Sequence, residues 1–406
     1  MKGSGVLKKL FLLCSVIASG WLCADELSGI LSKNKALLFD YQLQSNELQS
    51  DMLSKSWINP VMLQYRKNYS TQYGDKTIHT GNYTVMIDQP IFRSGGIYYA
   101  IKYSKALREA NHADIVLQRR QMIGDAVSIL FSLKKIKLEQ QKMKYQIKND
   151  IIDIRQKRDS YEAGLLDSSF LDQAILKKSQ DETALLEMEL NAMELRQRFS
   201  LLSDKKPEQF SLPKLKLISK KSYQMEHLEL KRDRYRAEEA DYNANVTRAK
   251  YLPNVSLQGQ YTDGDLNPMF YRPGSSMKEH YYNYGFSVSM PLDINSLSDI
   301  ELSKVEKLKA ATQLIDRKET VDEEYAWIKN SIGILERKIT LARKDAKVYQ
   351  NLYKITKNLV HAGEKTSMDA DVMYNSLQIR KLDQKIYAID KQIQLLKLYI
   401  RVENVL

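Results

Sequence analysis

Two long stretches of the chain, 92–200 and 292–406, space apolar residues alternately three and four positions apart and contain no proline. Because proline removes a helix hydrogen bond and clashes with the preceding turn, both stretches are free to form continuous helices. A heptad spacing sustained over such a length is typical of helices that pack side by side as coiled coils. The longest stripe is Tyr325, Ile328, Ile332, Leu335, Ile339, Ala342, Ala346, Tyr349, Tyr353, Thr356 and Val360.

A glycine ends each of the two outgoing helices. Gly164 follows Ala163 and Gly363 follows Ala362, and glycine just past a helix end is a common left-handed cap. The sequence therefore predicts a sharp turn and a returning helix in each stretch. At about 1.5 Å per residue, the first outgoing helix has a length on the order of 100 Å. The expected helices cover about 97–163, 168–202, 296–362 and 368–405.

Between paired prolines the apolar period changes from helical to two. Pro60 and Pro90 enclose one such segment, and Pro253 and Pro291 enclose the other. Each segment predicts a hairpin with an apolar, tyrosine-rich face and a face of small polar residues, which is the pattern of membrane-barrel strands with lipid outside and water inside. The expected strands cover about 57–73, 77–90, 254–262 and 281–290.

The alternative is a half-buried hairpin in a soluble domain. An apolar sheet face must be buried somewhere, and the rest of the chain offers no apolar material to cover two of them. Trp57 and Tyr251 stand beside the prolines on the apolar face, where they suit an aromatic belt. Four strands cannot close a barrel, and an open edge in lipid leaves backbone groups without partners. The protomer is therefore expected to oligomerise.

The two halves of the chain form a tandem repeat. Gly164 and Gly363 are 199 residues apart, the heptad stripes match at the same offset, and Pro90 and Pro291 are 201 residues apart. The predicted division is a signal peptide at 1–24, a first repeat at 25–202, a basic, proline-containing linker at 203–221 and a second repeat at 222–406.

The N-terminus has the layout of a secretory signal peptide. Three lysines precede an apolar run that ends at Ala18, and cleavage is expected after Ala24. Lipidation of Cys23 is the alternative, although Leu22 stands where a lipoprotein has a small residue. Both cysteines of the chain lie in this segment. The mature chain is therefore expected to have no disulfide, thiolate metal site or cysteine nucleophile.

Charge and composition narrow the function. Removal of residues 1–24 takes three lysines and no acids, so the formal charge falls from +12 to +9, and Lys and Arg alternate with Asp and Glu along the helices as on solvated faces. Nucleic acid is not an expected partner. No apolar run after the signal is long enough for a membrane helix, so strands are expected to make any crossing. No enzyme, cofactor or metal is expected, since the histidines are scattered and there is no phosphate-binding glycine loop.

The repeated order of hairpin, helix, glycine turn and returning helix resembles the TolC-like outer-membrane efflux proteins over nearly the whole mature chain. The most specific pieces are the segments 88–92 (DQPIF) and 289–292 (SMPL), and the turns at 161–172 and 360–372. The resemblance implies a mainly α fold in which long antiparallel coiled-coil helices form a periplasmic α-barrel. It also implies a homotrimer whose protomers each give four strands to a shared membrane β-barrel in outer-membrane lipid.

In that family, carboxylates after the second glycine turn line the closed periplasmic entrance. Asp369 lies six residues after Gly363, as in the family, whereas Val372 replaces the family's next Asp and Asp371 lies one position earlier. A carboxylate from each protomer, crowded at a narrow mouth, concentrates cations. The alternative is that Asp369 or Asp371 caps the returning helix.

The resemblance places contacts with a periplasmic adaptor on the two turns, for which a solvated loop is the alternative. The residues concerned are Gly164, Leu165, Leu166, Asp167 and Ser168, and then Gly363, Glu364, Lys365, Thr366 and Ser367.

The implied function is an outer-membrane exit duct, with helices that project into the periplasm, in a tripartite efflux or type I secretion system. Such a duct passively conducts what an inner-membrane transporter and its adaptor deliver, including the drugs behind multidrug resistance. Drugs, metal ions, solvents and a secreted polypeptide are all compatible with the sequence. The rival interpretation is a periplasmic coiled-coil adaptor or structural stalk. An adaptor, however, has one helical hairpin between glycine-rich β modules, whereas this chain has two helical hairpins in tandem.

Overall fold

The computed structural model of the chain describes residues 29–71, 77–265 and 278–403. The predicted signal peptide, with both cysteines, lies outside the described residues. The elements in chain order are α1 (Lys33–Ser54), β1 (Met62–Ser70), β2 (Ile78–Phe92), α2 (Gly96–Glu162), α3 (Ser168–Ser200), the short 3-10 helix η1 (Pro207–Gln209), α4 (Lys220–Glu226), α5 (Leu228–Lys250), β3 (Asn254–Gly264), β4 (His280–Ser289), α6 (Ser296–His361) and α7 (Ser367–Ile400).

The chain is mostly helical with one four-stranded sheet, as the apolar periods predict. Two element ends differ from the sequence estimate. Trp57 lies in a turn, and β1 begins only at Met62, after Pro60. At the other end, α7 stops at Ile400 because Val402 leaves the helix and pairs with His227 through a β-bridge.

The contacts divide the chain into two compact units. Unit 1 consists of 1–40, 115–228 and 319–406, and unit 2 consists of 41–114 and 229–318. Each unit therefore takes segments from both halves of the sequence repeat. The division into two successive repeats, 25–202 and 222–406, stays a prediction.

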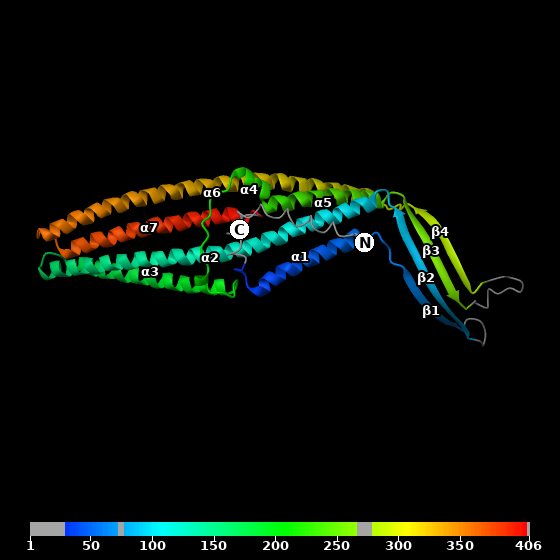
Figure 1. Cartoon of the computed structure of the whole chain (residues 1–406), viewed down its shortest axis with the longest axis horizontal. Coiled ribbons are helices and arrows are strands. Elements are labelled where there is room, and N and C mark those ends of the chain that lie inside the picture. The colour runs from blue at the N-terminus through cyan, green and yellow to red at the C-terminus, as the bar shows by residue number, and fades with distance from the viewer. Residues whose placement is uncertain (1–28, 72–76, 266–277, 404–406) are drawn as a thin grey trace, which may run out of the picture. The chain divides into compact units, whose positions relative to one another are not determined.

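In unit 1 the helices lie side by side in the order α6, α7, α2, α3 (Figure 1). Tyr353 of α6 stacks on Tyr374 of α7 at 5.6 Å between ring centroids. At the far side of the layer, Asp150 of α2 forms an ion pair with Lys177 of α3. The apolar stripe of the sequence lies inside this layer, where Ile332, Ile386 and neighbouring residues are buried. Two helices, α6 and α3, are the edges of the layer.

The central pair of the layer, α2 and α7, is joined by polar contacts one heptad apart. Lys135 pairs with Asp390 at 2.8 Å and Lys142 pairs with Asp383 at 2.7 Å. One heptad further, Asn375 Nδ2 donates a hydrogen bond to Asn149 Oδ1 at 2.9 Å. A one-heptad slip would keep at most one of the two ion pairs and leave the other groups without partners, so the three contacts together favour the observed register of the two helices.

Arg120 of α2 holds the C-terminal end of α7. Its side chain is nearly buried, its Nη1 donates to the carbonyl oxygen of Tyr399 at 3.2 Å, and its Nη2 donates to that of Glu403. Burial lowers the pKa of Arg120 to about 10, while Glu403 and Glu226 act in the opposite direction. The guanidinium therefore remains protonated at neutral pH.

Replacing Arg120 with Met is expected to lower the free energy of unfolding by about 2–4 kcal/mol, since two buried carbonyl groups lose their donor while the volume is kept. The measurement is the thermal midpoint of the helical circular dichroism signal in detergent. Arg119→Met is the matched control, because Arg119 is more exposed and its distance to Asp40 is 3.6 Å. Equal midpoints for the two variants would contradict the role of Arg120.

In unit 2 the helical segments follow the order α1, α2, α5, α6. Asn46 of α1 donates to the carbonyl of Arg108 on α2, Arg236 of α5 donates to Asn111 of α2, and Lys307 of α6 pairs with Asp241 of α5. The sheet is antiparallel throughout, in the order β1-β2-β3-β4. The hairpins of the two sequence halves thus meet through β2 and β3, and β1 and β4 are the edges.

Candidate functional site

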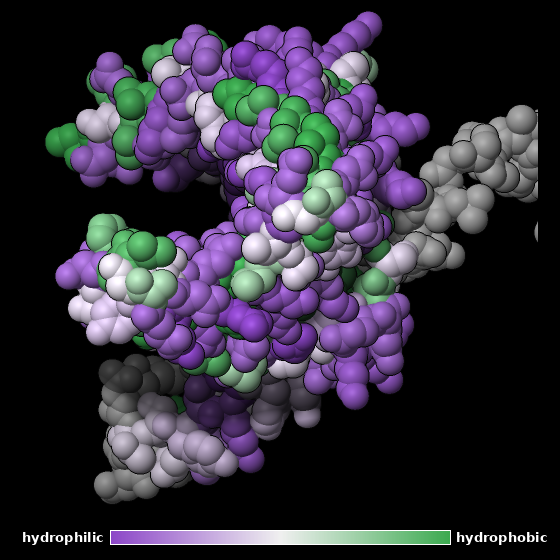
Figure 2. All heavy atoms as spheres, turned by 90° about the vertical axis from the view of Figure 1, so that its left-hand side faces the viewer, coloured by the Kyte–Doolittle hydropathy of each residue, from purple (hydrophilic) through white to green (hydrophobic). Residues whose placement is uncertain are grey.

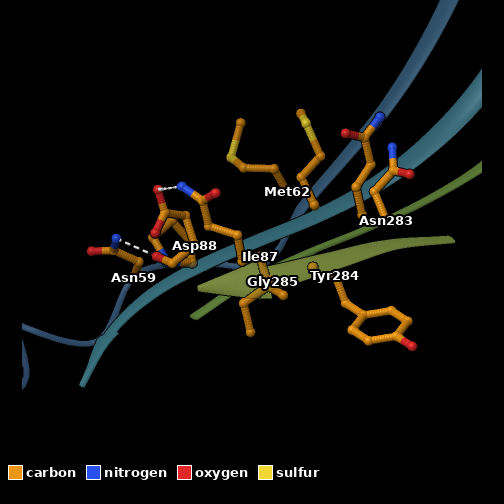
Figure 3. A pocket seen from close by; sticks show the side chains of 12 residues that line it. Asn59, Met62, Ile87, Asp88, Asn283, Tyr284 and Gly285 are labelled. Atoms are coloured by element: carbon orange, nitrogen blue, oxygen red, sulfur yellow. Dashed lines mark hydrogen bonds between the residues drawn. The ribbon is translucent and has the colours of Figure 1, made fainter. Parts of the chain in front are cut away.

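The sheet has two chemically different faces. Tyr65 pairs with Tyr83 across β1 and β2, and their rings lie 4.6 Å apart on the apolar face. The neighbouring positions on each strand point to the other face and are polar: Gln64 pairs with Thr84, and Arg66 pairs with Asn82. Met62 and Met86 form a further pair on that face. Figure 3 shows Met62 and Asn283 on one side of the sheet and Tyr284 on the other. The period of two in the sequence therefore marks the two faces.

The polar face carries a hollow of about 570 Å³ lined by residues of all four strands. Asp88 lies at one end of it, where its carbonyl accepts from Asn59 Nδ2 at 2.5 Å and its carboxylate accepts from Gln258 Nε2 at 3.4 Å (Figure 3). Amides and one carboxylate suit a water-filled surface and offer no catalytic pair. The residues that line the hollow are Asn59, Pro60, Met62, Met86, Ile87, Asp88, Gln258, Gly259, Gln260, Asn283, Tyr284 and Gly285.

The opposite face is apolar and uncovered by the described residues. Tyr284 is 90% exposed, and Leu63, Tyr282 and Phe286 are each more than 70% exposed. Burying one such side chain contributes about 1.5–3 kcal/mol, so a whole face left in water is costly. The face therefore needs a covering that the described residues do not supply.

The predicted aromatic belt is wrong for Tyr251. Its ring is only 8% exposed, and its hydroxyl donates to Asp299 Oδ2 at 2.6 Å. This hydrogen bond raises the pKa of Tyr251 and lowers that of Asp299. Tyr251 thus ties the end of α5 to the first turn of α6, while Trp57 is half-buried in the turn before β1.

The turn between α2 and α3 is a Schellman cap. Gly164 has φ +68°, its N–H donates to the carbonyl of Tyr161 at 2.9 Å, and the N–H of Leu165 donates to that of Ser160 at 2.9 Å. Asp167 then caps α3 by accepting from the N–H of Ser169 at 2.9 Å. The hydroxyl of Ser169, and then its backbone N–H, lower the pKa of the Asp167 carboxyl.

The turn between α6 and α7 has the same geometry. Gly363 has φ +76°, and the N–H of Glu364 donates to the carbonyl of Leu359 at 2.9 Å. Thr366 and Asp369 form a capping box: the N–H of Asp369 donates to Thr366 Oγ1, and the N–H of Thr366 donates to Asp369 Oδ2 at 3.0 Å. These hydrogen bonds lower the pKa of the Asp369 carboxyl. Asp369 therefore has the capping role of the alternative interpretation, and Asp371 is exposed outside the box.

The two turns differ in side-chain chemistry. The first presents Leu165, which is 80% exposed, and Phe170, whereas the second presents Glu364 and Lys365 at the positions after its glycine. Figure 2 looks onto the end of unit 1 that holds the turns, where a mostly hydrophilic surface carries small hydrophobic patches. A partner that docks there would meet one apolar and one charged turn.

Both edge helices of unit 1 carry a second, exposed apolar stripe, here called the edge seams. These stripes were not predicted from the sequence. The signal was available, because the α6 residues recur every seventh position. Among the described residues, Lys397 Nζ lies over the Trp327 ring at 5.0 Å from its centroid, and the seams are otherwise largely exposed. The α6 seam is Trp327, Ile334, Leu341, Val348 and Ile355, and the α3 seam is Leu176, Leu186, Leu190 and Met193, with exposed fractions of 48% to 64%.

The described residues, 29–71, 77–265 and 278–403, hold no group of three His, Cys, Asp or Glu side chains that could bind a metal ion. In the same part of the chain, every helix falls short of the length or the apolar composition that a membrane span requires.

Neither a protein-family model nor a curated protein matches the sequence of this chain. Solved structures match nearly all of it. The outer membrane protein VceC from Vibrio cholerae has a TM-score of 0.73 at 15% identity over 94% of this chain and 97% of VceC. The Campylobacter jejuni CmeC outer membrane channel has a TM-score of 0.73 at 16% identity over 95% and 86%, and the outer-membrane channel OprN has 0.72 at 14% over 94% and 89%.

The chain therefore has the fold of the TolC-like outer-membrane channels, and the resemblance drawn from the sequence is confirmed at the level of the fold. Among the matching structures is the open state of the MtrE outer membrane channel of Neisseria gonorrhoeae, with a TM-score of 0.66 at 10% identity.

Proposed function

We propose that this chain is one protomer of an outer-membrane exit duct that passively conducts substrates delivered by an inner-membrane transporter and a periplasmic adaptor. The observation that carries the proposal is the exposed apolar face of the sheet, with Tyr284, Phe286 and Leu63 outermost, opposite a polar face. Lipid on one side and water on the other satisfy both faces at once.

A membrane location requires several copies. The edges β1 and β4 have unpaired backbone groups on their outer sides, and lipid offers these groups no hydrogen bonds. Pairing β1 of one copy with β4 of the next satisfies both edges and closes a barrel. We propose three copies, following the TolC-like resemblance, which together supply an even number of strands.

The helix layer supports the same head-to-tail arrangement. The edge seams of α3 and α6 are different surfaces of one protomer, and an interface between them is heterologous and closes into a ring. Placing the α3 seam against the α6 seam of the next copy buries Leu186 and Leu190 against Leu341 and Val348 as a coiled coil. The closed ring of helices is the proposed periplasmic α-barrel.

The two helix turns are the proposed docking sites for the adaptor. Both turns are exposed at one end of the helix layer of unit 1, and their Schellman caps give the backbone after Gly164 and Gly363 a defined conformation. The segments concerned are 164–168 and 363–367. Their different chemistry fits two different contacts on one partner.

Asp369, and to a smaller extent Asp371, are the proposed gate carboxylates. Asp369→Asn is expected to change single-channel conductance and to weaken block by divalent cations in planar bilayers. Because hydrogen bonds with Thr366 lower the pKa of Asp369, the carboxylate stays charged below the usual carboxyl pKa. Block by divalent cations should persist as the pH falls to the usual pKa of a carboxyl group. It should be lost only below the lowered pKa of Asp369. Unchanged currents in Asp369→Asn would remove Asp369 from the gate.

The rival function is a periplasmic adaptor or stalk, which would leave the apolar sheet face in water. The test is to express the full chain, separate outer membrane from periplasmic extract, and reconstitute the purified product in planar bilayers. Heat-modifiable oligomers in the outer membrane and stepwise conductance support the duct. A detergent-independent monomer in the periplasmic extract would overturn it.

A further inference from the structure

Eight exposed cations form two matched stripes on the long helices of unit 1, here called the basic stripes. Each cation of α2 has a counterpart on α6 at an offset of 199 residues, which is the offset of the two glycine turns. The stripes are Lys144, Lys148, Arg155 and Arg158 on α2, and Arg343, Lys347, Lys354 and Lys357 on α6.

The basic stripes are not neutralised by neighbouring acids. Within the described residues, no ion pair joins any of the eight to a carboxylate, whereas Lys135, Lys142 and Lys157 on other faces of α2 each pair with an Asp. The alternation of charges in the sequence therefore does not describe this surface. The basic stripes remain exposed to solvent.

Both stripes lie on the face of the helix layer that the linker and α4 cross. Lys137, one heptad before Lys144, lines a hollow together with Phe210 and Leu212 of the linker. On α6, Asp322 lies three heptads before Arg343, and it pairs with Lys220 of α4 at 3.1 Å. Residues whole heptads apart share one side of a coiled-coil helix. The linker therefore marks the side to which the stripes belong.

That side is the outside of the proposed duct, a step that rests on the proposed function. A linker and a helix that crossed the inner wall in every protomer would obstruct the passage. The basic stripes therefore face the periplasm. At about 1.5 Å per residue, they begin roughly 10 Å from the glycine turns and extend to about 30 Å from them.

The composition of the stripes decides what kind of partner they fit. A helix packed along them would need an apolar contact in every heptad, and Ile151, one heptad after Lys144 and one before Arg158, is the apolar residue of the α2 stripe. On α6 the intervening position is Gln350. A solvated polyanion needs no apolar contact. Unpaired charges only one or two helix turns apart lie within about 10 Å, the screening length at 0.1 M salt, so they act on a polymer together.

We propose that the basic stripes bind the carboxylate-bearing stem peptides of peptidoglycan, the anionic polymer that surrounds such a duct in the periplasm. Peptidoglycan has many carboxylates and no apolar surface, which matches the composition of the basic stripes. The contacts hold the tunnel laterally in the cell wall, at a place distinct from the turns where the adaptor is proposed to dock.

The experiment is co-sedimentation of the full-length detergent-purified protein with isolated peptidoglycan sacculi. The test variant carries Lys144→Gln, Lys148→Gln, Arg343→Gln and Lys347→Gln. The control variant removes four exposed cations outside the stripes, through Lys105→Gln, Arg198→Gln, Lys304→Gln and Lys318→Gln. Both variants lose the same charge, and size-exclusion profiles establish that both assemble as the unaltered protein does.

The expected result is salt-sensitive binding of the unaltered protein and the control, with affinity about tenfold lower in the test variant, since each exposed charge contact contributes about 0.2–1 kcal/mol. Sacculi whose carboxylates have been amidated should retain none of the three. Equal binding by both variants, or undiminished binding to amidated sacculi, would overturn the proposal. Bilayer conductance of the same samples separates the two proposals. A protein that conducts but does not bind sacculi would overturn only the proposed role of the basic stripes. A protein that does not conduct would overturn the proposed duct.

Discussion

Leu341→Glu combined with Val348→Glu will abolish assembly and leave the protomer helical. Both side chains lie in the α6 seam, 60% and 55% exposed in the single chain, so their replacement removes no packing inside the protomer. In the proposed ring they are buried against the α3 seam, where two unpaired carboxylates cost several kcal/mol. The measurement is the oligomer mass in detergent, with circular dichroism on the same sample.

The matched control for the seam is Thr340→Glu combined with Asn351→Glu. Both positions are exposed on α6 outside the seam, and the change in side-chain size and charge is similar. The control should assemble as the unaltered chain does. Assembly of the seam variant at full yield would show that α6 is not an interface and that the ring closes elsewhere.

Tyr284→Arg combined with Phe286→Arg will prevent insertion of the barrel. Both side chains stand on the exposed apolar face of β4. An arginine on the lipid face costs about 2–4 kcal/mol near the middle of a bilayer, so the pair should reduce folded protein in the outer membrane by at least about tenfold. Quantifying the heat-modifiable band in membrane fractions measures this loss.

The polar face provides the control for this prediction. Asn283 and Ser287 lie on the opposite side of β4 and pair with Gln260 and Ser256, so Asn283→Arg combined with Ser287→Arg adds the same two charges on the side proposed to face water. The folded yield of this variant should stay within about twofold of the unaltered chain. An equal loss in both variants would mean that the two faces do not differ in their surroundings, which contradicts a membrane sheet.

The amino-acid sequence predicts the broad fold because local physics determines most of it. Glycine at 164 and 363 adopts positive φ, which other residues rarely tolerate, and the observed turns lie there. Proline positions separate helical from strand periods for the same kind of reason. The period of two also predicts which side chains of one strand share a face, whereas the register that places Tyr65 opposite Tyr83 comes from the structure.

What the sequence could not provide depends on contacts between distant segments. The end of α7 depends on the bridge between Val402 and His227, which are 175 residues apart. The pairing of β2 with β3, which joins the two halves, leaves no local signal either. The burial of Tyr251 against Asp299 was missed because an aromatic beside a proline looks the same whether it meets lipid or a neighbouring helix.

The candidate site could be predicted only in part from the sequence. The capping box of Thr366 and Asp369 follows from known spacing rules, whereas a gate role for Asp369 depends on copies of the chain that the sequence does not place. Heptad spacing finds every apolar stripe but cannot tell which stripe pairs inside the protomer. Only the order α6, α7, α2, α3 separates the buried stripe from the edge seams.

Copies of this chain are proposed to pair their edge strands β1 and β4 around a water-filled barrel. Disulfide trapping between these strands tests this proposal most directly. Both cysteines lie in the predicted signal peptide, so the mature chain allows clean cysteine pairs between the edge strands. One cysteine replaces Leu63 or Tyr65 on β1, and the other replaces Tyr284 or Phe286 on β4. Because β1 and β4 are opposite edges of one sheet, a bond between them joins two copies. The account predicts that at least one pair gives a covalent ladder ending at a discrete trimer in outer membranes, and monomers at every pair would contradict it.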